Sequence, residues 1–232
     1  MTRAAINSPE FPPPLAHRPH VKICGLSRPQ DALLALDLGA SFLGIIMTAK
    51  SARFVDEAAA TQLVAEIRSQ VKTPPRLIGV FTNESAGEIA RLQRELDLFA
   101  VQIHAPLTDH AKYLPPSRII PAVNIRDAAD AEALSQLDPA HGAVLADAFV
   151  PGAKGGTGKV FDHSLVQAIY PQRRVFLAGG ITPDNIASIM AAHRTRHPYA
   201  LDLSSGVEES PGVKSHDKLR AFFAHFAAAP AH

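Results

Sequence analysis

A single cysteine ends the first strand-like run of this 232-residue chain, which reads VKICGL at residues 21–26. One Cys cannot form an internal disulfide, and it lacks the paired thiols of a redox or zinc motif. Cys24 therefore either fills space, as buried cysteines often do, or acts alone on a substrate. Its place at the end of a strand, beside Gly25, favours a catalytic thiol.

A carboxylate ends a second apolar run, where Asp147 follows GAVLA at residues 142–146. Burying it costs free energy unless it is paired or functional, and a cap for the following loop is the alternative interpretation. Partial burial raises the pKa of a carboxyl group and suits it to donate a proton. Cys24 as base and Asp147 as acid make a workable pair, and we expect the nearby Lys22 to favour the thiolate.

Two short turns predict a phosphate site: Gly179 and Gly180 in one, and Ser204, Ser205 and Gly206 in the other. Backbone N–H groups in such turns can face an anion. Tight turns alone also explain such glycines. However, both turns follow the last two predicted strands, and the loops there are the usual phosphate site of a βα barrel.

A third glycine-rich stretch reads PGAKGGTGK at residues 151–159 and contains Gly155 and Gly156. It is not a nucleotide P-loop, because Ala153 replaces the first Gly and Val160 follows the Lys where Ser or Thr is needed. We interpret it as a mobile lid over the substrate, which brings Gly155 and Gly156 into the predicted binding site.

Arg53 lies in the predicted loop after the second strand. Arg can hold a planar carboxylate with two parallel hydrogen bonds, so Arg53 is a candidate to bind an acidic substrate. A solvated surface arginine is the alternative. No metal site is predicted, because the histidine pair spaced four residues apart, His193 and His197, lies in a basic run typical of a helix C-terminus.

The elements that position these residues repeat one cycle of strand, loop and helix after residue 20. Strands are predicted at 21–26, 41–47, 76–82, 98–104, 118–125, 142–149, 174–181 and 199–204. Helices are predicted at 29–38, 57–70, 85–96, 128–137, 162–170, 183–193 and 215–228, with a brief or irregular connection at 108–114. Eight such units predict a single (β/α)8 TIM barrel with a parallel eight-stranded core. A doubly wound open sheet is less favoured, because no glycine fingerprint follows the first strand.

Alternation along the strands predicts which side chains face the barrel interior. Val21 and Ile23 suit the helix side, which sends Lys22 and Cys24 inward. Asp147 has the inward parity on the sixth strand. The same rule predicts a set of inward polar residues near the carboxyl ends of the other strands: Gln102, His104, Asp202 and Ser204.

Composition excludes several function classes. A net charge of +1 with 19% charged residues gives no broad footprint for nucleic acid, and no apolar stretch reaches the roughly 20 residues of a membrane span. Residues 1–19 are rich in proline and have no apolar run typical of a secretory signal, so we expect a flexible tail before a barrel at 20–232. A lone thiol without disulfides or an export signal suggests a cytoplasmic protein.

Several motifs are specific in combination and order, and together they cover about residues 20–225. They are VKICGL at 21–26, VQIH at 101–104, GGTGKVFD at 155–162, LAGGITPDN at 177–185 and DLSSGVE at 202–208. This pattern resembles the phosphoribosylanthranilate isomerase family of tryptophan biosynthesis.

The resemblance implies an Amadori rearrangement of a phosphorylated small molecule without a cofactor, in a monomer or homodimer. It implies Cys24 as general base, Asp147 as general acid, Arg53 as the group that binds the anthranilate carboxylate and Asp202 as an active-site residue. The turns at Gly180 and at 204–206 match the family's phosphate loops. The chain departs from the family at Ala105, where Gly is usual, and at Met47–Ala49, which lack the usual aromatic residue and proline.

Two alternatives stay open. The related isomerase of histidine biosynthesis performs the same rearrangement on a substrate with two phosphates, but uses a carboxylate at the position of Cys24. A barrel that binds a sugar phosphate without converting it is the non-enzyme alternative, and the presence of both Cys24 and Asp147 argues against it.

Overall fold

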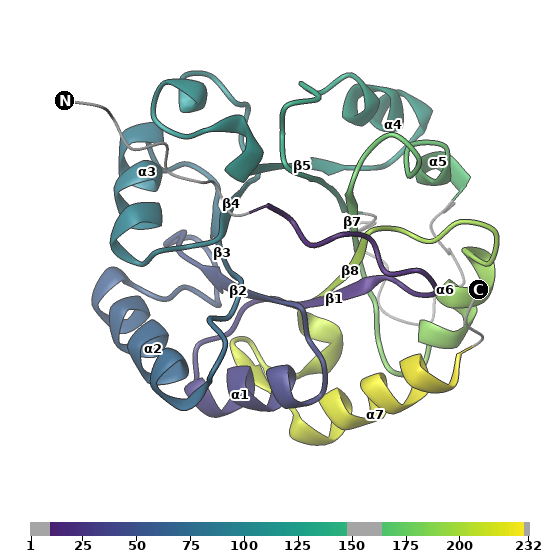
Figure 1. Cartoon of the computed structure of the whole chain (residues 1–232), viewed down its shortest axis with the longest axis horizontal. Coiled ribbons are helices and arrows are strands. Elements are labelled where there is room, and N and C mark those ends of the chain that lie inside the picture. Colours follow the sequence, from purple (N-terminus) through teal and green to yellow (C-terminus); the bar gives the residue numbers. More distant parts are fainter. Residues whose placement is uncertain (1–9, 148–163, 230–232) are drawn as a thin grey trace.

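Eight parallel strands close into a barrel in sequence order, with β8 hydrogen-bonded to β1 (Figure 1). The computed structural model describes residues 10–147 and 164–229. The strands are β1 (His20–Ile23), β2 (Phe42–Ile46), β3 (Leu77–Phe81), β4 (Ala100–Ile103), β5 (Ile119–Asn124), β6 (Val144–Asp147), β7 (Val175–Ala178) and β8 (Ala200–Leu203). The predicted barrel is therefore confirmed, with strands shorter than their predicted runs.

Helices surround the barrel and cover its apolar outer face (Figure 1). They are α1 (Pro29–Asp37), α2 (Glu57–Gln70), α3 (Ala86–Glu95), α4 (Ala128–Ser135), α5 (Ser164–Gln167), α6 (Ile186–Ala192) and α7 (His216–Ala228). Local sequence sets their starts: side chains of Asp56, Ser85 and Ser215 accept hydrogen bonds from the first-turn amides of α2, α3 and α7. No helix in the described ranges is long and apolar enough to cross a bilayer.

The structure differs from the predicted helices at α6, which begins at Ile186 rather than at residue 183. The Asn185 side chain accepts from the amide of Thr182 and donates to the carbonyl of Gly180, both at 2.8 Å. These local hydrogen bonds hold residues 180–185 in a turn that competes with the helix.

Two connections follow β4 and β8. The irregular connection between β4 and β5 is confirmed as two short 3-10 turns, η1 (His110–Lys112) and η2 (Pro116–Arg118). After β8 comes a 3-10 turn, η3 (Ser205–Val207), and then an antiparallel pair that the sequence did not predict, β9 (Glu208–Ser210) and β10 (Val213–Lys214).

The predicted alternation along the strands is confirmed. Val21, Ile23, Val144 and Ala146 pack in the layer between barrel and helices. Strand residues of the opposite parity face the interior, where they and adjoining residues form a separate apolar cluster with five aromatic rings: Phe11, Phe42, Ile78, Phe99, Ala100, Ile120, Ala143, Leu145, Phe176, Tyr199 and Ala200.

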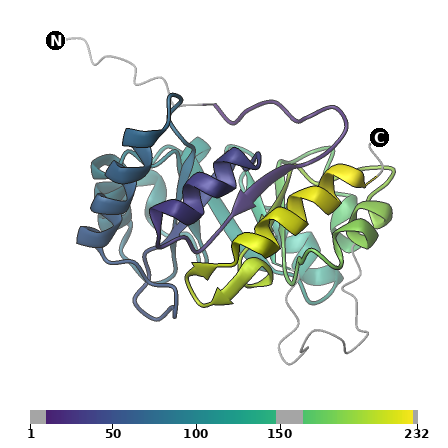
Figure 2. The same cartoon turned by 90° about the horizontal axis from the view of Figure 1, so that it is seen from below.

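Residues 10–19 differ from the expected flexible tail. They cross the amino-terminal opening of the barrel (Figures 1 and 2). The Phe11 ring is buried there, with its centroid 4.8 Å from that of Phe99, and the Tyr199 hydroxyl donates to the Pro12 carbonyl at 2.8 Å. The aromatic end of the barrel interior therefore orders this segment, because covering it removes apolar surface from water.

Candidate active site

A cavity of about 230 Å³ lies at the carboxyl-terminal end of the barrel. Ten of the thirteen predicted site residues line it: Cys24, Gln102, His104, Asp147, Gly179, Gly180, Asp202, Ser204, Ser205 and Gly206. A larger hollow of about 830 Å³ beside β5 and α4 shares His104 with it but lacks both Cys24 and Asp147. The smaller cavity is therefore the one that combines the predicted base, acid and anion-binding turns.

A buried cation is hydrogen-bonded to two residues that line this cavity, Gln102 and Asp202. Lys22 is fully buried, and its Nζ donates to Gln102 Oε1 and to Asp202 Oδ2, both at 2.7 Å. Burial alone lowers the pKa of Lys22, but the Asp202 carboxylate and its hydrogen bond to Nζ oppose burial, and the pKa lies above its usual value. Lys22 is therefore charged, and the second carboxylate oxygen of Asp202 is buried without a partner in the described chain, where it lines the cavity.

The same network sets the state of His104. Because Gln102 Oε1 accepts from Lys22, its Nε2 donates to His104 Nε2 at 2.7 Å, which places the ring proton on Nδ1. Burial and the Lys22 charge lower the pKa of His104 to about 4. The open cavity leaves this ring accessible to solvent, which weakens the effect, but His104 is neutral at pH 7.

Cys24 lies against a residue that has no side chain. A Cβ on Gly44 would come within 2.7 Å of the Cys24 sulfur, so the thiol occupies the space that Gly44 leaves. Burial raises the pKa of Cys24, while the Lys22 and Lys214 charges oppose this rise without overcoming it. The expected help from Lys22 is therefore present but outweighed. A high pKa makes the thiolate scarcer at pH 7 and also a stronger base.

Asp147 ends β6 and is half-buried at the cavity wall. Parallel pairing places it beside Asn124 on β5 and Ala178 on β7. The base and the acid thus come from β1 and β6, which are three strands apart around the ring. Both side chains line the same cavity.

The two predicted phosphate turns are packed together. A Cβ on Gly206 would collide with the Ile181 carbonyl, so only glycine lets the turn after β8 approach the turn after β7 this closely. Ser204 Oγ is buried without a partner among the described residues and lines the cavity. Ser205 and Gly206 begin η3, and the first amides of a helical turn have no acceptor within it. These donors suit a phosphate.

Comparison with known proteins agrees with this arrangement. Residues 21–225 match the sequence model of the family described as N-(5'phosphoribosyl)anthranilate (PRA) isomerase. The chain belongs to this family. A curated N-(5'-phosphoribosyl)anthranilate isomerase of Chromohalobacter salexigens is 40% identical over 206 residues, which cover 88% of this chain and 92% of that protein.

Solved structures of phosphoribosylanthranilate isomerases share the fold. The Thermotoga maritima enzyme superposes with a TM-score of 0.77 at 30% identity, over 90% of this chain and 99% of that one. A second structure holds reduced 1-(o-carboxyphenylamino)-1-deoxyribulose 5-phosphate and superposes with a TM-score of 0.74 at 28% identity, over 90% and 99% of the two chains. That compound carries a carboxyl group at one end and a phosphate at the other.

Three further residues were predicted for the site: Gly155, Gly156 and Arg53. Gly155 and Gly156 lie outside the described residues. Arg53 lies at the rim rather than in the wall: a Cβ on Gly25, the neighbour of Cys24, would be 2.7 Å from Arg53 Cδ. Its guanidinium forms an ion pair with Glu208 at 2.7 Å.

Sequence reasoning did not single out Glu208 and Lys214, which the structure joins to Arg53 by ion pairs. Both belong to the unpredicted β9–β10 pair, and both are buried. The signal available was the position of Glu208, which directly follows the turn that contains Gly206. Within residues 10–147 and 164–229, no group of three or more His, Cys, Asp or Glu side chains could hold a metal ion.

Proposed function

We propose that this cavity carries out the Amadori rearrangement of N-(5'-phosphoribosyl)anthranilate, with Cys24 as general base and Asp147 as general acid. The family supplies the reaction. The observation that supports the assignment of roles most strongly is that the thiol and the carboxylate line one cavity together with the two phosphate-type turns.

The steps follow from these positions. Asp147 donates a proton to the ring oxygen of the ribose, the bond from this oxygen to C1' breaks, and the nitrogen lone pair forms an iminium. The Cys24 thiolate removes the proton from C2', and the electrons of that bond neutralise the iminium to give an enolamine. This enol gains a proton at C1', loses one from its hydroxyl and becomes the ketone. The substrate nitrogen is the electron sink, so the steps need no cofactor.

Binding at the two charged ends of the substrate would hold its ribose between the catalytic groups. Ser204 Oγ and the amides of Ser205 and Gly206 would bind the phosphate, and Arg53 would bind the carboxylate. Hydrogen bonds of Arg53 to Glu208 use Nε and Nη2, which leaves Nη1 for a ligand. Fixing both ends orients C2' and lowers the entropic cost of reaching the transition state.

The test is a coupled fluorescence assay on purified variants. We expect Cys24→Ala and Asp147→Asn each to lower turnover at least ~10²-fold, the usual contribution of a positioned base or acid. Asp37→Asn, which changes an exposed carboxylate of α1, is the matched control and should keep wild-type turnover. Near-normal turnover of Cys24→Ala would refute its role, and the same result for Asp147→Asn would refute the assignment of the acid.

We also propose that the chain works in the cytoplasm, as a monomer or a homodimer. Ten of the thirteen predicted site residues line one cavity within a single chain, which supports a site that does not need a second copy. A related structure is described as monomers generated from dimeric phosphoribosylanthranilate isomerase of Thermotoga maritima, so both states are known for that protein. Light scattering on the purified chain distinguishes them here.

A further inference from the structure

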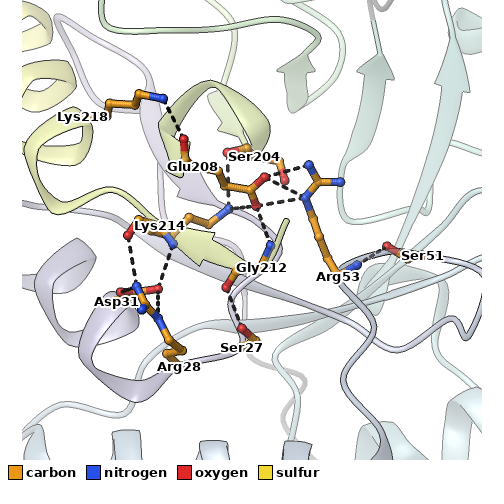
Figure 3. Close-up of polar contacts among 10 residues, drawn as sticks. All are labelled: Ser27, Arg28, Asp31, Ser51, Arg53, Ser204, Glu208, Gly212, Lys214 and Lys218. Atoms are coloured by element: carbon orange, nitrogen blue, oxygen red, sulfur yellow. Dashed lines mark hydrogen bonds and ion pairs between the residues drawn. The ribbon is translucent and has the colours of Figure 1, made fainter. Parts of the chain in front are cut away.

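One buried carboxylate joins three parts of the chain at the rim of the cavity (Figure 3). Glu208 begins β9 and is 6% exposed. Its two oxygens accept from Arg53 Nε at 2.9 and 3.0 Å, from Arg53 Nη2 at 2.7 Å and from Lys214 Nζ at 2.7 Å. The amide of Gly212 adds a bond of 3.2 Å. Glu208 thus fixes a guanidinium from the loop after β2 and an ammonium from β10.

The same carboxylate is linked to the phosphate turn. Lys214 Nζ also donates to the carbonyl of Ser204 at 3.3 Å, and Lys218 Nζ donates to the Glu208 carbonyl at 2.7 Å. Through Lys214, Glu208 is therefore linked to Ser204, which lines the cavity and whose hydroxyl has no partner among the described residues. Arg53, on the other side of Glu208, lies beside Gly25.

The charges of this cluster are unequal. Burial raises the pKa of Glu208, but its bonds to Arg53 and Lys214 outweigh burial and hold the pKa below its usual value. The carboxylate is therefore ionised near neutral pH. Arg53 and Lys214 supply two positive charges against one negative charge, and the surplus favours a ligand with anionic groups.

We propose that Glu208 is a positioning residue, which fixes the distance between the guanidinium that binds the substrate carboxylate and the turn that binds its phosphate. The inference rests on the proposed role of Arg53. On this proposal, the Arg53–Glu208–Lys214 cluster selects substrates whose two anionic groups have this spacing. A free arginine on a loop would sample many rotamers, whereas a bidentate carboxylate holds it in one.

The experiment compares KM and kcat in Glu208→Gln, Arg53→Ala and the double variant. Glu208→Gln keeps the shape and removes the charge, and we expect KM to rise roughly tenfold, on the order of one lost charge-assisted hydrogen bond, while kcat changes less. Arg53→Ala should raise KM further. The double variant should match Arg53→Ala, because Glu208 acts through Arg53 and the two effects are then not additive.

Asp31→Asn is the matched control. Asp31 is also a fully buried carboxylate, and it accepts from Arg28 and from the amide of Lys214 (Figure 3). It also accepts from His216, and none of its hydrogen bonds among the described residues involves Arg53. We expect it to lower the melting temperature with little change in KM. An equal rise in KM for Asp31→Asn and Glu208→Gln would mean general loosening and would overturn the proposal.

The outcomes separate the two levels of inference. If Arg53→Ala raises KM and Glu208→Gln does not, the positioning role is wrong while the proposed function stands. If Arg53→Ala leaves KM unchanged, the proposed role of Arg53 fails, and this inference fails with it. If Glu208→Gln does not fold, Glu208→Asp is the substitute, because it keeps the charge on a side chain one methylene shorter. A KM between those of the wild type and Arg53→Ala would support the proposal. An unchanged KM in Glu208→Asp would contradict a fixed spacing.

Discussion

The two ends of the barrel are built from the same eight strands and have opposite character. The amino-terminal end is closed by apolar contacts, in which Phe11 packs among rings from β2, β7 and the residues that precede β4 and β8. The carboxyl-terminal end is polar and hollow, and carries Cys24 and Asp147. Figure 2 shows the crossing segment and the β9–β10 pair at opposite ends.

One fold therefore provides stability at one end of the barrel and a polar cavity at the other. All strands run in the same direction, so their carboxyl ends meet at one opening of the barrel. Polar residues at that opening therefore do not reduce the stability of the apolar packing at the amino-terminal opening. Lys22 lies in the layer between, where the interior changes from aromatic to charged. Substitutions at the two ends should therefore have separable effects.

The largest effect expected outside the catalytic pair is on stability at the amino-terminal end. Phe11→Ala removes a buried ring, which typically costs about 3–5 kcal/mol of the free energy of unfolding. Turnover of the folded fraction should not change, because the cavity is at the other end. Urea unfolding and the fluorescence assay measure the two quantities. Leu15→Ala on the same segment is the control, since Leu15 is 43% exposed. Lost turnover in folded Phe11→Ala would break the separation of the two ends.

A smaller effect is expected at Gly25, at the carboxyl-terminal end. Its φ of +74° strains any residue with a side chain, which costs about 1–2 kcal/mol. The new Cβ would also displace Arg53, so KM should rise. Gly39→Ala is the matched control, because Gly39 also has a positive φ, of +107°, and a Cβ added there would have no atom within 4 Å. It should lose stability like Gly25→Ala and keep its KM; a KM that rises equally in both variants would contradict this account.

The smallest expected effect is a pH dependence of stability from the amino-terminal end. His20 Nε2 donates to the Pro13 carbonyl at 3.0 Å and Nδ1 accepts from Ser41 Oγ at 2.9 Å, and burial lowers the pKa of the ring below 6.5. Below pH 6.5 the unfolded chain binds a proton that the folded chain does not. The free energy of unfolding should therefore fall as the pH falls through 6.5, and His20→Gln should remove this part of the slope. Urea unfolding between pH 7.5 and 5 measures it; an identical slope in both proteins would exclude His20 as the cause.

The sequence predicted well which residues line the cavity, because their direction follows a local rule repeated at each strand. Side chains alternate between the faces of a strand, so the helix-facing Val21 and Ile23 determine where Cys24 points. Glycine turns are equally local, since φ values of +109° and +63° at Gly179 and Gly180 need that residue type.

The amino-terminal closure was not predictable in this way. Phe11 stands in a proline-rich segment without periodicity, which by itself is typical of a flexible tail. Its burial depends on an aromatic surface whose members are far apart in the sequence: Phe42, Phe99, Phe176 and Tyr199. No sequence pattern near Phe11 indicates that this aromatic surface forms.

The barrel, the direction of its inward side chains and the turns that suit a phosphate could be predicted from the sequence, because strand alternation and backbone conformation are properties of neighbouring residues. That burial outweighs Lys22 in setting the pKa of Cys24 follows from the fold instead. The fold also brings Glu208 to Arg53, 155 residues away in the chain. Desolvation and ion pairing depend on what surrounds a group in space, and barrel closure brings those groups together.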